Sequence, residues 1–235
     1  MLLRGYTLLS LLVSLSLSSF LLLIVVTFYL DVQRQSKSLH FQMQLQTELE
    51  RVIQLMAKDI RRAGFRAPPD NAQQVNFSLF ESDAERSLQL FSINGRNASD
   101  CVLFFYDLDM NGCLGGKFKD KTCIRNGRNN THQLERELFG YRLNNGMIET
   151  RLTYKSAVNA RCKLTECQRY LQQVACYSGG WVDLLDSQEY VINDLSFRWL
   201  VEKHALEIYL KGHLNKQTHV QYETTLVVPL LNSEG

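Results

Sequence analysis

An uninterrupted apolar run near the N-terminus limits what this chain can fold into. From Tyr6 to Leu30 the sequence has 25 consecutive residues without a charge. As a helix rising about 1.5 Å per residue this run is roughly 37 Å long, which exceeds the roughly 30 Å hydrocarbon core of a bilayer. A cleaved signal peptide has a shorter apolar region, of about 7–15 residues, and ends in small residues that 27–31 lack. We therefore predict that 6–30 forms a membrane-spanning helix that stays with the protein.

The helix is predicted to continue well beyond this run. Neither glycine nor proline occurs from Tyr6 to Ala63. After Phe41, apolar residues recur every three or four positions, which is typical of one helix face. These residues are Leu45, Leu49, Val52, Ile53, Met56, Ile60 and Ala63. The pattern predicts an amphipathic helix over 31–64 that packs on a globular head, with Gly64 as its C-terminal cap.

Residues 65–235 are predicted to form a β-rich head large enough for its own core. Short apolar or alternating stretches bounded by polar residues indicate its strands. The predicted strands are 101–106, a hairpin over 139–152 with a three-residue turn at 144–146, 190–200, 206–210 and 220–228. The fold class is therefore α+β, with a long N-terminal helix packed on an antiparallel sheet.

Six cysteines follow the apolar run, and none precedes it. They are Cys101, Cys113, Cys123, Cys162, Cys167 and Cys176. An even number on one side of a membrane span indicates disulfides in an oxidising compartment, and this places the head outside the cytoplasm. Six cysteines allow 15 pairings, and the sequence does not choose among them. Free thiols are the alternative, whereas the absence of a Cys-x-x-Cys pair disfavours zinc.

At the N-terminus, Arg4-Gly5 is followed by Tyr6-Thr7-Leu8-Leu9 and the long apolar helix. In these residues the chain resembles the type IV prepilins. The resemblance implies that 1–5 is a leader, that a prepilin peptidase cleaves after Gly5, and that Tyr6 is then N-methylated. It also implies a single-pass protein of the inner membrane whose head lies in the periplasm before the chain enters a fibre.

The head resembles one branch of this family, the minor pilins of PilW type, which include prepilin peptidase-dependent protein B, and the related J-type pseudopilins of type II secretion. The carrying residues are 62–65, 106–112, 139–143 and 148–150, with Trp181 near a late strand. The resemblance implies a low-abundance subunit that helps to initiate fibre assembly together with other minor pilins and the major pilin. A J-type pseudopilin and a tip-exposed adhesin or DNA-uptake module are the alternatives.

Ser10 departs from the prepilin pattern, which has glutamate at this fifth mature position. The family pattern implies that the glutamate pairs with the N-terminal amine of a neighbouring subunit. A subunit at the fibre tip lacks one neighbour, so an uncharged residue would suit it, because an unpaired carboxylate in an apolar fibre core is costly. Ser10, Ser14 and Ser18 also form a stripe of small residues that would let helices approach closely.

Asp107, Asp109 and Asn111, followed by Gly112, open like an EF-hand calcium loop. The twelfth position should be a glutamate, but Phe118 stands there, so Asp120, Glu135 or Glu137 would have to complete the site. Calcium is thus a possible cofactor. The alternative is an ordinary acidic turn, in which Asp and Asn side chains hydrogen-bond to the local backbone.

The remaining chemistry of the sequence argues against a polyanionic partner and against catalysis. The chain has 26 basic and 24 acidic residues, for a net charge of +2. One basic cluster, Lys117 to Arg128, contains a single aromatic residue and is interrupted by Asp120, so a solvated loop is favoured over nucleic-acid binding. No nucleophile-elbow pattern is present, and the protein is predicted not to be an enzyme.

Overall fold

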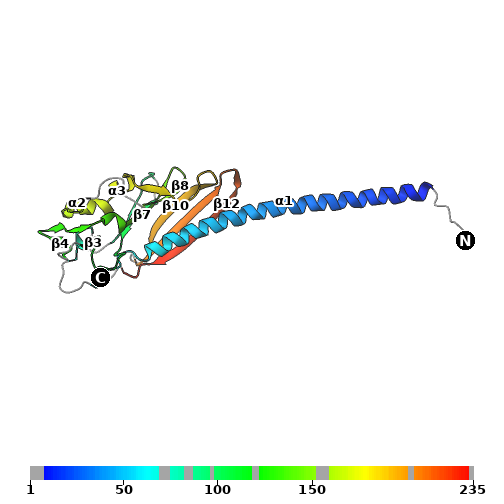
Figure 1. Ribbon diagram of the computed structural model, residues 1–235. Helices are drawn as coiled ribbons and strands as arrows, with labels where there is room; N and C mark the ends of the chain where they lie inside the picture. The colour runs from blue at the N-terminus through cyan, green and yellow to red at the C-terminus, as the bar shows by residue number, and fades with distance from the viewer. Residues whose placement is uncertain are drawn as a thin grey trace. The chain divides into compact units, whose positions relative to one another are not determined.

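The computed structural model describes residues 8–68, 75–81, 87–95, 98–117, 122–151, 159–200 and 204–232. The chain forms two compact units, Met1–Gln44 and Leu45–Gly235. The first contains most of one long helix, and the second contains the end of this helix and all the described strands (Figure 1).

Helix α1 comprises Leu8–Ile60, 53 residues in all. Within the first unit its described residues from Leu8 to Leu39 are all exposed, including the long apolar run. Among the described residues, α1 is the one helix that is long and apolar enough to cross a membrane. An apolar surface of this length is unstable in water, so it requires a lipid or protein environment.

The end of α1 belongs to the second unit and supplies part of its core. Six of the seven apolar residues of the predicted stripe lie within α1, and each of the six has no exposed surface. The helix ends at Ile60, three residues before the predicted Ala63, because the following turn tightens to i→i−3 hydrogen bonds, as between Ala63 N–H and Ile60 O at 2.9 Å. Gly64 then adopts a φ of +77°, and a side chain there would lie 2.9 Å from Asn232 O.

Five strands form an antiparallel sheet in the order β1-β2-β7-β8-β9. Their bounds are Leu88–Phe91 for β1, Cys101–Phe105 for β2, Leu138–Asn144 for β7, Met147–Arg151 for β8 and Trp181–Asp183 for β9. All five β2 residues are buried, as a strand covered on both faces requires.

The β7–β8 turn corrects one prediction. It has two central residues, Asn145 and Gly146, because Asn144 pairs with Met147, whereas the sequence indicated a three-residue turn. Both central residues have positive φ, 48° and 75°. This backbone matches the twist of a tight hairpin and favours the Asn-Gly pair found here.

The three C-terminal strands form a second antiparallel sheet in the order β10-β11-β12. They comprise Tyr190–Leu200, Ala205–Leu214 and Gln217–Pro229, at the places the sequence predicted. Burial alternates residue by residue along β11, so one sheet face contributes to the core. The bonds Phe197 N–H to Ser99 O at 2.8 Å and Ile192 N–H to Gly146 O at 2.7 Å connect this sheet to the first.

Close packing and three polar contacts attach the buried end of α1 to the strands. An added Cβ at Gly212 in β11 would come within 3.3 Å of the Leu49 side chain, so the glycine lets helix and sheet approach closely. The Tyr141 hydroxyl of β7 donates to Asp59 at 2.6 Å. Tyr222 and Thr224 of β12 each donate to Glu50 Oε1 at 2.8 Å. These contacts fix the rotation of the helix about its own axis.

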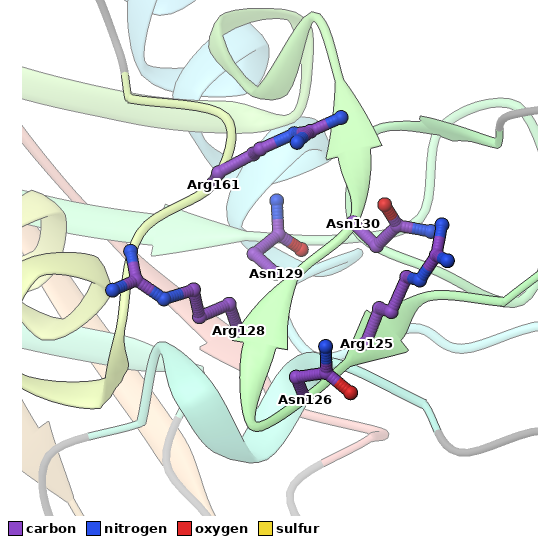
Figure 2. A pocket seen from close by; sticks show the side chains of 6 residues that line it. All are labelled: Arg125, Asn126, Arg128, Asn129, Asn130 and Arg161. Atoms are coloured by element: carbon purple, nitrogen blue, oxygen red, sulfur yellow. The ribbon is translucent and has the colours of Figure 1, made fainter.

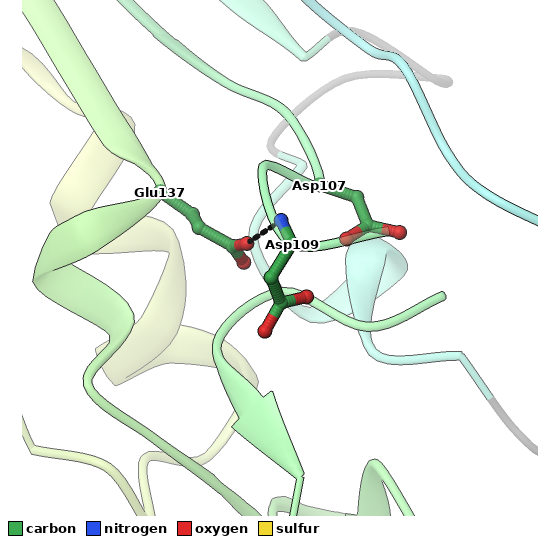
Figure 3. A group of neighbouring side chains, drawn as sticks. All are labelled: Asp107, Asp109 and Glu137. Atoms are coloured by element: carbon green, nitrogen blue, oxygen red, sulfur yellow. Dashed lines mark hydrogen bonds between the residues drawn. The ribbon is translucent and has the colours of Figure 1, made fainter. Parts of the chain in front are cut away.

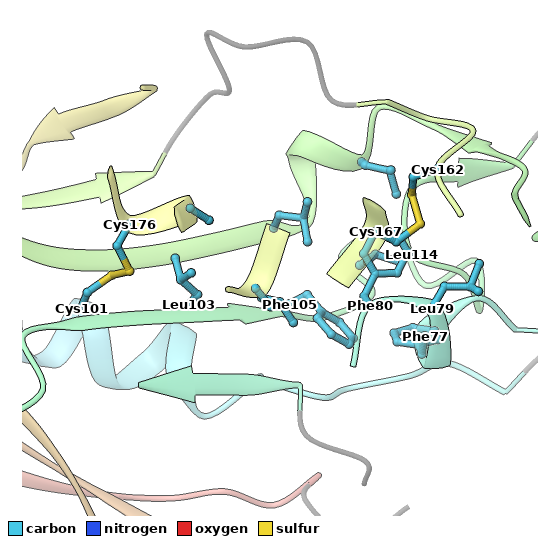
Figure 4. Packing of buried hydrophobic residues seen from close by; sticks show 14 residues of the cluster. Phe77, Leu79, Phe80, Cys101, Leu103, Phe105, Leu114, Cys162, Cys167 and Cys176 are labelled. Atoms are coloured by element: carbon cyan, nitrogen blue, oxygen red, sulfur yellow. A yellow bond between two sulfur atoms is a disulfide. The ribbon is translucent and has the colours of Figure 1, made fainter. Parts of the chain in front are cut away.

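A second core lies on the other side of β2, and several short elements contribute residues to it (Figure 4). These elements are η1 (Phe77–Leu79), β4 (Ile124–Arg125), η2 (Leu134–Arg136), α2 (Leu164–Gln168), η3 (Arg169–Leu171) and α3 (Gln173–Tyr177). Strand β4 pairs with β5 (Arg128–Asn129), and β3 (Gly116–Lys117) pairs with β6 (Thr131–His132). All six cysteines form disulfides, in the pairs Cys101–Cys176, Cys113–Cys123 and Cys162–Cys167. The prediction of disulfides is thus confirmed.

Candidate functional site

The predicted processing site, Gly5 and Tyr6, lies outside the described residues, whereas the serine stripe lies within α1. Ser10, Ser14 and Ser18 are all exposed. The hydroxyl of Ser14 donates to Leu11 O at 2.9 Å, and that of Ser18 donates to Ser14 O. The hydroxyl groups of Ser14 and Ser18 are therefore bonded within the helix, which lowers the cost of placing them in an apolar environment. A role in helix contact stays a prediction.

The loop after β2 brings three acidic side chains together. One carboxylate oxygen each from Asp107, Asp109 and Glu137 lies within 4.8 Å of the others (Figure 3). Glu137 sits between η2 and β7, and its Oε1 accepts hydrogen bonds from the N–H groups of Leu108 at 2.8 Å and Asp109 at 3.2 Å. Of the residues considered for completing a calcium loop, Asp120 lies outside the described residues. Of the other two, Glu135 and Glu137, Glu137 is in this group.

Asp107 and Asn111 organise the same loop through the backbone. Asp107 is buried, and its carboxylate accepts from the N–H groups of Ala67, Asn111 and Gly112 at 3.2, 3.1 and 2.7 Å. The Asn111 side chain accepts from Cys113 N–H at 2.8 Å and donates to Gly115 O at 3.1 Å. These are the bonds of an acidic turn.

Burial makes the negatively charged form of two carboxyl groups in the acidic loop unfavourable. Burial is the main cause that raises the pKa of Glu137 to about 7, and the Asp109 carboxylate adds to the shift. Burial likewise raises the pKa of Asp107 above its ordinary value. A divalent cation would offset this cost, since carboxylate oxygens are the ligands that calcium prefers. The site can thus act as a turn or as a cation site.

Without calcium, we expect the head to lose stability as the pH rises from about 5 to 8. The folded-state pKa of Glu137 exceeds the unfolded value, so its contribution is complete below about 4.5 and is lost as the pH rises through about 7. The shift corresponds to about 3 kcal/mol. Denaturant unfolding with a chelator should show this loss in the wild type and in the Glu135→Gln control. An equal pH dependence in Glu137→Gln would contradict the assignment.

The predicted basic cluster is only partly described, because 118–121 lie outside the described residues. Lys117 is in β3, whereas Arg125 and Arg128 lie in the β4–β5 hairpin and line a pocket. Sequence analysis missed a third arginine there, Arg161, because only the tertiary fold brings it to this hairpin. It also did not single out Glu137 from the other two acidic candidates, for the same reason.

A long N-terminal helix whose end packs on an antiparallel head defines a pilin-like protein. The family model described as prepilin peptidase-dependent protein B matches residues 38–230, and the chain belongs to this family. It is 48% identical over 195 residues to a Haemophilus influenzae protein described as uncharacterized, an alignment that covers 82% of this chain and 81% of that protein. No solved structure matches the chain. The family gives the protein a role related to pili or pseudopili and is not a known enzyme class.

Proposed function

We propose that this protein is a minor pilin, a low-abundance structural subunit that helps to initiate assembly of a type IV pilus. The proposal rests chiefly on one observation in a chain that belongs to this family: α1 has an exposed apolar part and a part that packs into the head. The apolar run of α1 is exposed, whereas the apolar stripe from Leu45 to Ile60 is buried in the head. In the proposed function, the exposed run first anchors the subunit in the inner membrane and then packs against the helices of other subunits.

The processing chemistry supports the same proposal. The family is named for dependence on prepilin peptidase, and Arg4-Gly5-Tyr6 provides a cleavage site for such an enzyme. The proposed partners are therefore the prepilin peptidase, other minor pilins and the major pilin. The three disulfides fit a periplasmic head, since that compartment is oxidising.

Fibre counts in cells that lack the gene test the function. We expect few or no fibres after deletion, recovery with the wild-type gene, and no recovery with Gly5→Val, because uncleaved subunits stay anchored. Normal fibre numbers combined with lost adhesion or DNA uptake would contradict the assembly role and favour a tip-exposed binding module. Normal pili with lost protein secretion would favour a J-type pseudopilin.

Ser10 supports a position at or near the fibre tip. Substituting Ser10→Glu introduces a carboxylate that has no partner amine at the tip, and an unpaired charge in an apolar core is costly. We expect fewer fibres from Ser10→Glu, while Ser10→Ala, which keeps a small uncharged side chain at this position, leaves their number unchanged. Wild-type fibre numbers from Ser10→Glu, with labelled subunits along the shaft, would refute the tip position.

Calcium binding at Asp107, Asp109 and Glu137 is a separate proposal. It is supported by the proximity of the three carboxylates, whose oxygens lie within 4.8 Å of one another. Calcium at 100 times its dissociation constant would stabilise the head by about 2.7 kcal/mol. We expect a higher melting temperature in calcium than in chelator for the wild type, and a smaller difference for Asp109→Asn. Identical melting temperatures in calcium and in chelator would contradict calcium binding and indicate that the loop is an ordinary acidic turn.

A further inference from the structure

A pocket of about 400 Å³ lies between the β4–β5 hairpin and the loop before α2 (Figure 2). Three arginines and three asparagines line it: Arg125, Asn126, Arg128, Asn129, Asn130 and Arg161. These six described residues carry three positive charges and no negative charge. Figure 2 shows Arg125 and Arg161 extending from different segments toward Asn130, with Arg128 on the other side of Asn129.

The floor of the pocket is rigid. Asn129 and Asn130 are 1% and 6% exposed. The Asn129 side chain donates to Ala160 O at 2.6 Å, and its N–H donates to Cys162 O at 3.0 Å, so the hairpin is bonded to the segment that carries Arg161. Disulfides at Cys123 and Cys162 hold both walls, since these cysteines are close in sequence to Arg125 and Arg161. The arginines therefore project from a preformed frame.

The β4–β5 hairpin places its two arginines on different sides of the pocket. Arg125 and Arg128 are direct cross-strand partners that flank a turn at Asn126 and Gly127, whose φ angles are 53° and 69°. In Figure 2 their side chains extend to opposite sides, so that of the two it is Arg125 that extends toward Asn130, as Arg161 does.

The chemistry of the lining narrows the class of anion. A guanidinium group forms paired hydrogen bonds with phosphate oxygens, and two such groups match a phosphomonoester of about two negative charges better than a single carboxylate. A volume of about 400 Å³ is within the range of small-molecule sites, so it admits a carrier as well as the phosphate. The six lining residues include no aromatic ring, which nucleobases require for stacking.

We propose that the pocket between Arg125 and Arg161 binds a phosphomonoester group, either as free phosphate or carried on a sugar. The guanidinium groups of Arg125 and Arg161 hold the phosphate oxygens, whereas Arg128 contributes only its positive charge. The carboxamide of Asn126, which lies at the exposed hairpin turn, can donate to and accept from sugar hydroxyls. This binding is independent of the assembly role, because it uses neither α1 nor the acidic loop.

Calorimetric titration of the full-length protein in a non-ionic maltoside detergent and phosphate-free buffer tests the proposal. The probes are inorganic phosphate, glucose 6-phosphate, glucose and a single-stranded DNA oligomer. We expect glucose 6-phosphate to bind and glucose not to bind. Tighter binding of glucose 6-phosphate than of inorganic phosphate supports a sugar phosphate, and equal binding supports free phosphate as the natural ligand.

Arginine variants separate a built site from general positive charge. We expect Arg161→Gln to weaken phosphate binding by about tenfold, because the substitution removes the charge-assisted hydrogen bonds that one guanidinium group makes to the phosphate. Arg198→Gln removes one charge from an exposed β10 side chain outside the pocket and should leave binding within about twofold of wild type. Equal weakening by both variants, no binding of either phosphate, or binding of the DNA oligomer alone would overturn the proposal.

Discussion

Replacing Cys101 and Cys176 together with alanine is expected to destabilise the head by about 4 kcal/mol. The bridge connects β2 to α3 across 75 residues of sequence, so in the chain-entropy account it removes much of the freedom of the unfolded state. A domain of this size typically has only about 5–15 kcal/mol of stability in total. The double substitution leaves no unpaired thiol that could form a wrong bridge.

The matched control is the Cys162→Ala and Cys167→Ala pair, whose bridge spans only five residues. The same chain-entropy relation gives about 2 kcal/mol for this short loop. Denaturant unfolding of both variants under non-reducing conditions gives the comparison. An equal or smaller loss for the Cys101–Cys176 pair would show that the long bridge does not restrain the unfolded chain in this way.

Replacing Phe105 with alanine is expected to destabilise the head by about 3–5 kcal/mol, because the substitution leaves a cavity that the surrounding side chains cannot fill. Phe105 has no exposed surface. Its ring centroid lies 5.5 Å from that of Phe77 and 6.3 Å from that of Phe80. Since Phe77 lies in η1 and Phe80 caps its C-terminal end, the substitution should also weaken the packing of that element on β2.

Leu108→Ala is a suitable control for this measurement, because Leu108 lies three residues later and is 47% exposed. Removing an exposed side chain usually changes stability by no more than about 0.5 kcal/mol. Denaturant midpoints measured on both variants should therefore differ widely. A loss below about 1 kcal/mol for Phe105→Ala would contradict the packing of the second core.

The long helix and the six longest described strands could be predicted because local patterns determine them, whereas β1, β3, β4, β5, β6 and β9 are too short to show such a pattern. The spacing of Leu45, Leu49 and Val52 indicates a buried helix face, and the bounds of β10 agree with its pattern residue for residue. The β7–β8 turn was predicted one residue too long, because Asn144 and Asn145 are equally good turn formers and only the pairing of Asn144 with Met147 distinguishes them.

The pairings between distant segments could not be predicted, because no local pattern encodes them. The connectivity of the disulfides depends on how α2 and α3 cover the second core. Glu137 joins Asp107 only once η2 and β7 are in place. Arg161 likewise reaches the β4–β5 hairpin through the bond from Asn129 to Ala160. The residue types at each candidate site were visible in the sequence, but their partners were not.

Mass analysis of the N-terminus tests the central claim most directly. The protein would be purified from cells with and without a prepilin peptidase, and its N-terminal peptide identified. A prepilin-type subunit should begin at N-methylated Tyr6 when the peptidase is present and retain Met1–Gly5 when it is absent. An N-terminus at Met1 in both cells would contradict the account, whatever the head binds.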